Sequence, residues 1–176
     1  MACLVWNCQG AASRSFKRAL SFLSLTHKPL IACLLEPKVS SSHANTICSS
    51  LGYEEWVRVE AVGFSGGIWV LWKDSINIEV IDTHPQFITL QVHHAELGVW
   101  RLSVIYGSPN PYLKRKLFAD LTTNTSDYQG PWLLAGDFNA ATSREEVNNP
   151  ENFSTTRCSD FNEWLFREGL IDLGFT

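Results

Sequence analysis

Short apolar runs and helical patterns alternate in the first fifty residues. Two of the apolar runs there, at residues 2–6 and 30–35, have the length of a buried strand, and a third such run occurs later, at residues 131–135. Each of the three runs stops at a turn signal. Between the first two runs, apolar residues repeat with the spacing of one helix face, at Phe16, Ala19, Leu20 and Leu23. Ser13 precedes this helix at the position expected of an N-cap.

Three further helices follow from the same spacing. A weak one is expected over residues 40–51, another after Pro111, and a last one that closes near Gly169. Their predicted inward residues are Ile47, Cys48 and Leu51, then Leu113, Leu117, Phe118 and Leu121, and finally Phe161, Trp164 and Leu165.

Between residues 53 and 106 the apolar period changes to two. The predicted inward residues are Ile76, Ile78 and Val80, then Ile88, Leu90 and Val92. The residues between them, such as Asn77, Glu79, Thr89, Gln91 and His93, are polar. This alternation is typical of half-buried antiparallel strands. Turns are expected near residues 63–67, 73–75 and 85. The whole pattern predicts an α/β fold in which two sheets pack face to face and helices flank them.

Composition narrows the class of protein. Hydrophobic residues make up 45% of the 176 residues and charged residues 18%, which excludes a disordered chain. The length fits one domain over residues 1–176. No apolar stretch is long enough to cross a bilayer, and no secretory signal pattern opens the chain. Five cysteines without a C-x-x-C spacing favour reduced, mostly buried thiols in an intracellular protein, nuclear or cytoplasmic rather than secreted.

Polar residues stand where predicted strands end. Asn7, Glu36 and Asp137 each follow an apolar run, and Tyr106 ends another with Asn110 shortly after it. A carboxylate directly after a buried strand is costly unless it faces solvent, a partner or a metal. Two carboxylates with carboxamides suit Mg²⁺, which binds few protein oxygens and keeps water for a phosphate. The net charge of −4 neither favours nor excludes nucleic acid, since a local patch suffices.

Each of these residues also has an ordinary structural interpretation. Glu36 precedes Pro37 and fits a turn, Asp137 follows Gly136 and fits another, and Asn7 is a common loop residue. Three basic residues stand together at Lys114, Arg115 and Lys116. We expect them to form a solvated helix face rather than a nucleic-acid contact. Trp69 and Trp72 are expected in the core.

Five sequence words occur in an order that resembles the endonuclease/exonuclease/phosphatase family, to which deoxyribonuclease I and the apurinic endonucleases belong. They are Trp6-Asn7-Cys8-Gln9-Gly10, Leu35-Glu36-Pro37-Lys38, Gly66-Gly67-Ile68-Trp69-Val70, Val104-Ile105-Tyr106-Gly107 and Leu134-Ala135-Gly136-Asp137-Phe138-Asn139. Within the family, the words are most similar to those of the endonuclease domain of plant LINE-type non-LTR retrotransposons.

The resemblance implies a DNase I-like fold and metal-assisted hydrolysis of a phosphodiester, most simply in DNA. It implies that Asn7 and Glu36 hold Mg²⁺, with Mn²⁺ as the alternative ion. Asp137 and Asn139 would orient the attacking water and the phosphate. Tyr106 would contact the phosphate, and Asn110 is a further candidate for that contact. Neither a membrane nor a particular oligomeric state is implied.

The chain departs from the family at its C-terminal side. The family ends in a Ser-Asp-His word, whereas all five histidines here precede Asp137. The resemblance therefore predicts a domain truncated before its last strands, with low or no turnover. His93 and His94 lie in a predicted strand and are poor substitutes. Two alternatives stay open: a non-catalytic module that binds nucleic acid or a protein, and an unstable retrotransposon remnant without a function of its own.

Overall fold

The computed structural model describes residues 1–61, 66–147 and 155–174. Its contacts divide the chain into two compact units. Unit 1 contains residues 1–106 and 129–137, and unit 2 contains residues 107–128 and 138–176. Each unit is described by itself, and a single domain over residues 1–176 stays a prediction. No helix among the described residues is both long and apolar enough to span a membrane.

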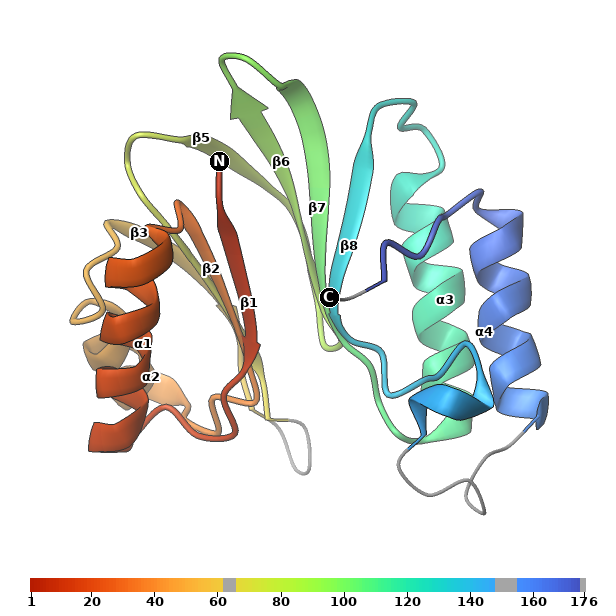
Figure 1. Ribbon diagram of the computed structural model, residues 1–176, viewed down its shortest axis with the longest axis horizontal. Coiled ribbons are helices and arrows are strands. Elements are labelled where there is room, and N and C mark those ends of the chain that lie inside the picture. The colour runs from red at the N-terminus through yellow and green to blue at the C-terminus, as the bar shows by residue number, and fades with distance from the viewer. Residues whose placement is uncertain (62–65, 148–154, 175–176) are drawn as a thin grey trace. The chain divides into compact units, whose positions relative to one another are not determined.

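Unit 1 is built from two four-stranded sheets (Figure 1). The first sheet has the spatial order β1 (Cys3–Asn7), β2 (Ile31–Leu35), β4 (Ile68–Trp72) and β3 (Glu55–Val59). The second has the order β5 (Asn77–His84), β6 (Phe87–His94), β7 (Gly98–Tyr106) and β8 (Trp132–Asp137). The pairs β1–β2 and β7–β8 are parallel, and the other pairs are antiparallel, as predicted for the strands between residues 53 and 106.

The two sheets of unit 1 pack face to face through a common apolar core. Cys33, Leu35 and Val70 from the first sheet belong to the same cluster as Leu90 and Val104 from the second. This packing and the mixed order of helices and strands confirm the predicted fold class. Trp69 and Trp72 are buried, as the sequence predicts.

Two helices cover the outer face of the first sheet (Figure 1). They are α1 (Arg14–His27) and α2 (Ser41–Cys48). Phe16 and Leu20 of α1 are buried in a second apolar cluster with Leu34 and Trp69, because these strand residues point away from the partner sheet. Ser13 caps α1 by accepting a hydrogen bond from the Phe16 amide at 3.0 Å. The α2 helix ends at Cys48, three residues before the predicted end.

The burial expected from the period-two pattern differs from the structure at two positions of the second sheet. Val80 is 40% exposed rather than inward, and the register of β5 shifts directly after it, between Val80 and Asp82. Thr89 alternates with the core residues Ile88 and Leu90 as predicted, but it is fully buried instead of exposed. Its hydroxyl pairs with that of Ser103 at 2.9 Å, and the indole of Trp132 donates to the same Ser103 oxygen at 2.9 Å. Mutual hydrogen bonding removes the cost of burying both hydroxyls.

The predicted turns at 73–75 and near Pro85 are present, whereas most of the turn near 63–67 lies outside the described residues. All five cysteines are free thiols, of which Cys33 and Cys48 are buried and the other three are half-buried. The thiols are thus less deeply buried than expected.

Unit 2 contains the helices α3 (Pro111–Thr125) and α4 (Thr155–Arg167) and the short η1 (Arg144–Glu146). Aromatic rings join the two long helices: Phe118 of α3 stacks on Phe161 and Trp164 of α4, with centroids 5.5 and 4.8 Å away. Phe118, Phe161 and Trp164 are all predicted as inward residues, so this pairing confirms the predicted apolar faces of the two helices. Leu113 is an exception, since it is 42% exposed.

Lys114 is also placed contrary to prediction. Its side chain is only 6% exposed instead of lying on a solvated face. The ammonium donates to the carbonyl oxygen of Asn139, so the buried charge has a polar partner.

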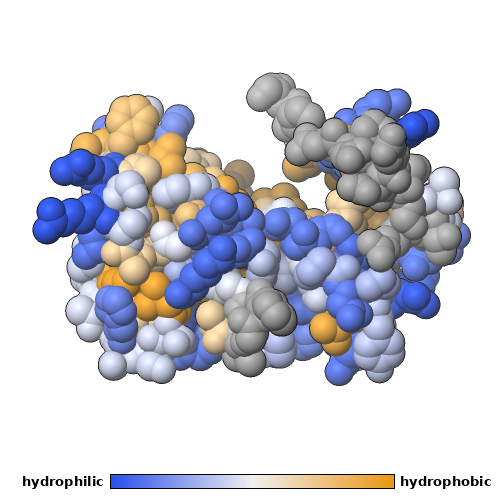
Figure 2. Space-filling model, turned by 90° about the horizontal axis from the view of Figure 1, so that it is seen from below, coloured by the Kyte–Doolittle hydropathy of each residue, from blue (hydrophilic) through white to orange (hydrophobic). Residues whose placement is uncertain are grey.

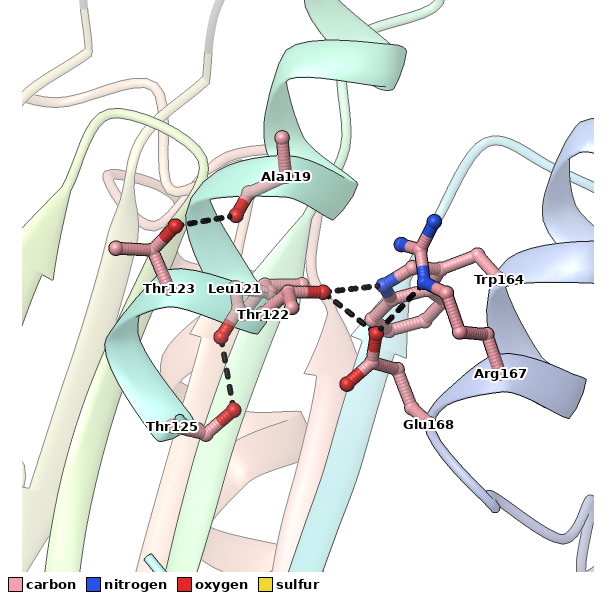
Figure 3. Close-up of polar contacts among 8 residues, drawn as sticks. All are labelled: Ala119, Leu121, Thr122, Thr123, Thr125, Trp164, Arg167 and Glu168. Atoms are coloured by element: carbon pink, nitrogen blue, oxygen red, sulfur yellow. Dashed lines mark hydrogen bonds and ion pairs between the residues drawn. The ribbon is translucent and has the colours of Figure 1, made fainter. Parts of the chain in front are cut away.

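Polar contacts add to the aromatic pairing of α3 and α4 (Figure 3). The Thr122 hydroxyl donates to the Glu168 carboxylate at 2.7 Å and accepts from the Trp164 indole at 3.2 Å. Arg167 binds the same carboxylate oxygen at 3.2 Å. The hydroxyl of Thr123, one residue along α3, bonds only within its own helix in Figure 3, to the Ala119 carbonyl oxygen.

These contacts predict that Thr122→Val lowers the free energy of unfolding by about 1–2 kcal/mol, because it removes two hydrogen bonds, one of them to a charged group. Thr123→Val is the matched control on the same helix and should change it by less than about 0.5 kcal/mol. Urea unfolding followed by tryptophan fluorescence measures both. Equal losses in the two variants would show that the contacts between the helices contribute nothing.

Candidate active site

Four of the predicted site residues lie together at one end of unit 1. Asn7 ends β1, Glu36 follows β2, and Tyr106 and Asp137 end β7 and β8 as direct register partners. Because β1 runs parallel to β2 and β7 parallel to β8, the last residues of each pair reach the same end of their sheet. In Figure 1 β1 and β2 finish at the lower end, and Figure 2, seen from that side, shows mainly hydrophilic residues in the middle of the face.

The carboxamide of Asn7 connects the two sheets at this point. Its Nδ2 donates to Glu36 Oε1 at 3.3 Å and to Asp137 Oδ2 at 3.2 Å. The two carboxylates come from positions 101 residues apart in the chain. Without a donor between them, neighbouring negative charges would repel each other, so the amide stabilises an arrangement that is otherwise unfavourable.

A left-handed backbone conformation places the Glu36 side chain. Its φ angle is +53°, which is uncommon for a residue with a Cβ and is often found at functional sites. The Glu36 amide donates to the Gly67 carbonyl oxygen at 3.2 Å. A Cβ on Gly66 would lie 2.7–2.9 Å from the Cα, Cβ and Cγ of Glu36, so only glycine leaves room for this carboxylate. Gly66 is therefore part of what holds Glu36 in place.

A second glycine brings the strands of the site together. A Cβ on Gly136 would lie 2.0 Å from the Ile105 carbonyl oxygen, and the residue has a φ of +144°. Glycine at this position lets β8 approach β7, so that Asp137 comes into register with Tyr106.

Lys38 adds a positive charge to the site. Its Nζ lies 2.9 Å from Glu36 Oε2, and its side chain is 53% exposed against 18% for Glu36. The hydrogen bond from Lys38 is the main reason that the pKa of Glu36 is lower than usual, and hydrogen bonds from Tyr106 and Asn7 act in the same direction. Glu36 is therefore a carboxylate at neutral pH.

Tyr106 takes part as a hydrogen-bond donor. Burial raises the pKa of its phenol well above the usual value, and its hydrogen bond to Glu36 and the nearby charges of Glu36 and Asp137 raise it further. The phenol stays protonated at physiological pH, so its hydroxyl can donate to an oxygen but cannot serve as a base.

The residues present fit a hard divalent cation. Asn7 Oδ1 is buried and has no hydrogen-bond partner, although buried polar atoms are normally paired. This oxygen belongs to the amide that reaches both carboxylates. Within the described parts of the chain, no three or more His, Cys, Asp and Glu residues are grouped to hold a metal. A site with two carboxylates and an amide oxygen suits Mg²⁺, which keeps several waters, better than zinc.

The other two predicted residues belong to unit 2. Asn110 is the N-cap of α3, and its Oδ1 accepts from the amides of Tyr112 and Leu113 at 2.9 and 3.3 Å. Asn139 has a φ of +47°, and its Nδ2 donates to the Gly107 carbonyl oxygen at 2.8 Å. The structure thus gives both residues a structural part, and their contact with a phosphate stays a prediction.

Two of the histidines lie far from these residues. His93 and His94 pair with Val99 and Gly98, at the opposite end of β7 from Tyr106. Val99 and Tyr106 are seven positions apart in the chain, which is about 23 Å along a strand. This distance agrees with the expectation that neither histidine acts at the site.

Sequence reasoning missed Lys38, Gly66 and Gly136 as parts of the site. All three occur within the sequence words singled out above, so the words were the available signal. Their parts in the site depend on close approaches between distant segments, which no local pattern reveals.

A model of the Endonuclease/Exonuclease/phosphatase family matches residues 4–168. Comparison with curated proteins finds no match. Among solved structures, the AP endonuclease LMAP from Leishmania major has a TM-score of 0.74 at 15% identity, over 94% of this chain and 66% of that one. The chain thus spans slightly less than two thirds of that protein.

Two further structures share the fold. The endonuclease domain of TRAS1, a telomere-specific non-LTR retrotransposon, has a TM-score of 0.73 at 16% identity, over 99% of this chain and 75% of that one. The 3′-5′ exonuclease NExo from Neisseria meningitidis has a TM-score of 0.66 at 20% identity, over 94% of this chain and 71% of that one.

The bridging amide predicts the effect of Asn7→Asp. This nearly isosteric change replaces the donor with a third carboxylate, so it should lower the free energy of unfolding by about 1–3 kcal/mol at neutral pH without metal. Urea unfolding measures the change.

Asn45→Asp is the matched control. The Asn45 Oδ1 accepts a hydrogen bond from Arg58 Nε at 2.9 Å, and a carboxylate oxygen at this position can accept the same bond. It should change the unfolding free energy by less than about 0.5 kcal/mol. An Asn7→Asp protein as stable as this control would contradict the bridging role of Asn7.

Proposed function

Because the chain belongs to the Endonuclease/Exonuclease/phosphatase family, we propose that it is a divalent-metal-dependent phosphodiester hydrolase domain of endonuclease type that acts on DNA. The observation that carries the proposal is the position of the Asn7 amide between Glu36 and Asp137. Its nitrogen, Nδ2, donates to both carboxylates, and its buried oxygen, Oδ1, has no hydrogen-bond partner. Mg²⁺ is the proposed ion and Mn²⁺ the alternative.

Each residue of the site has a proposed part. Glu36 and the Asn7 Oδ1 hold the cation, which supplies positive charge where negative charge develops on the phosphate. Asp137 orients the attacking water, and Asn139 orients the phosphate. The Tyr106 hydroxyl, kept protonated by its surroundings, donates to a phosphate oxygen. Asn110 is a further candidate for a phosphate contact: its Oδ1 caps α3, and its Nδ2 would donate to a phosphate oxygen.

Two fold relatives support DNA as the substrate class. One is described as an AP endonuclease and another as the endonuclease domain of a non-LTR retrotransposon. The sequence words point in the same direction, toward a LINE-type endonuclease of a plant retrotransposon. This origin is part of the proposal, as is the specific phosphodiester that the domain cuts.

The expected turnover of the 176-residue chain is low. All five histidines precede Asp137, and a missing general base or its equivalent typically reduces a rate by about 10²–10⁴-fold. This observation favours one second candidate, a nucleic-acid-binding module that does not cut. The two functions differ in whether a phosphodiester is hydrolysed, which is directly measurable.

We expect the purified chain to nick supercoiled plasmid slowly with Mg²⁺ and to stop when the metal is chelated. Glu36→Ala and Asp137→Ala should each reduce the nicking rate by about 10²-fold or more, because each removes a charge that holds or orients a reactant. Gel electrophoresis of the plasmid over time measures the rate.

Glu54→Ala is the matched control. Glu54 pairs with Lys73, which follows β4 at the end of the first sheet opposite to Glu36. Its removal should leave nicking unchanged. Nicking that survives both site variants would place the activity elsewhere, and salt-sensitive DNA binding in a gel shift without nicking would favour the second candidate.

A further inference from the structure

The ammonium of Lys38 lies 2.9 Å from a carboxylate oxygen of Glu36, the residue proposed above to hold the metal ion. We propose that Lys38 is a built-in counter-cation, which holds the Glu36 carboxylate in the metal-free protein and is exchanged for the divalent ion when the ion binds. Lys38 then weakens metal binding and sets its affinity. This inference rests on the proposed function, since it concerns the same site.

Both oxygens of the Glu36 carboxylate are already engaged. Oε1 accepts from the Asn7 amide at 3.3 Å, and Oε2 is 2.9 Å from the Lys38 ammonium. Asn7 also presents the unpartnered Oδ1 and is neutral, so its contact is compatible with a cation nearby. The ammonium is not compatible, because two positive charges on one carboxylate repel each other. Lys38 is therefore the partner that leaves.

The backbone around Glu36 cannot supply this movement. The amides of Glu36 and Lys38 donate to the carbonyl oxygens of Gly67 and Gly66 at 3.2 and 2.9 Å. Gly66 also lies against Glu36 too closely to admit a Cβ. The exchange is thus left to the Lys38 side chain. Because that side chain is 53% exposed, its ammonium can move into solvent without losing its hydration.

The ammonium of Lys38 favours the charged form of Glu36. Its hydrogen bond is the largest cause of the lowered pKa of this carboxyl group. The ion pair therefore stabilises the carboxylate before any metal arrives. A partly exposed ion pair of this kind is weak enough to be displaced, yet it still competes with the incoming ion.

Lys38→Met tests the exchange in the full 176-residue chain. Lys38 has a φ of +54°, and lysine and methionine are equally strained in this left-handed backbone conformation. The change therefore removes the charge without altering the backbone strain. We expect titration calorimetry with MgCl₂ to show about two- to fivefold tighter binding than in the wild type. Lys38→Arg keeps the cation and should restore wild-type affinity. Lys17→Met, which removes a lysine bonded to the Ser50 hydroxyl, is the control and should have no effect.

Circular dichroism checks that each variant is folded, and Lys38→Gln replaces Lys38→Met if the latter is not. A purely structural role for Lys38 would weaken metal binding, which is the opposite sign. Unchanged or weaker binding in the charge-free variant, with normal binding in the wild type, overturns the exchange and leaves the proposed hydrolase standing. Failure of both wild type and variant to take up Mg²⁺ overturns both proposals.

Discussion

One carboxamide holds the candidate active site together. Glu36 and Asp137 end strands in two different sheets, and the Asn7 amide donates to both. The apolar core between the sheets brings these ends near each other, but it supplies no force that keeps two negative charges in one place. The amide supplies that force and leaves its own oxygen facing no partner. The same interaction therefore stabilises the site and leaves an oxygen available for the proposed cation.

The sequence was sufficient for the framework of this site. Strands with parallel neighbours gather their last residues at one end of a sheet, so the polar residues after apolar runs could be grouped from the apolar pattern alone. Asn7, Glu36, Tyr106 and Asp137 do lie together. The α1 helix was equally readable, because its cap at Ser13 and its apolar face are local features.

The parts that escaped prediction all depend on contacts between distant segments. The partner of Thr89 is Ser103 on the next strand, and the burial of Lys114 depends on the Asn139 carbonyl. Neither pairing has a local periodicity. The need for glycine at position 66 likewise arises from Glu36, thirty residues earlier. Alternation rules assign a residue to a face, but a polar side chain is buried wherever a partner happens to satisfy it.

The long separation between Asn7 and Asp137 bears on how the protein is made. Hydrogen bonds between residues 130 positions apart are formed late, since the intervening chain must first be ordered. During synthesis from the N-terminus, Asn7 and Glu36 leave the ribosome well before Asp137 does. The nascent chain therefore carries Asn7 and Glu36 without Asp137 until β8 has been synthesised, and the cluster of these three residues can form only after β8 has docked.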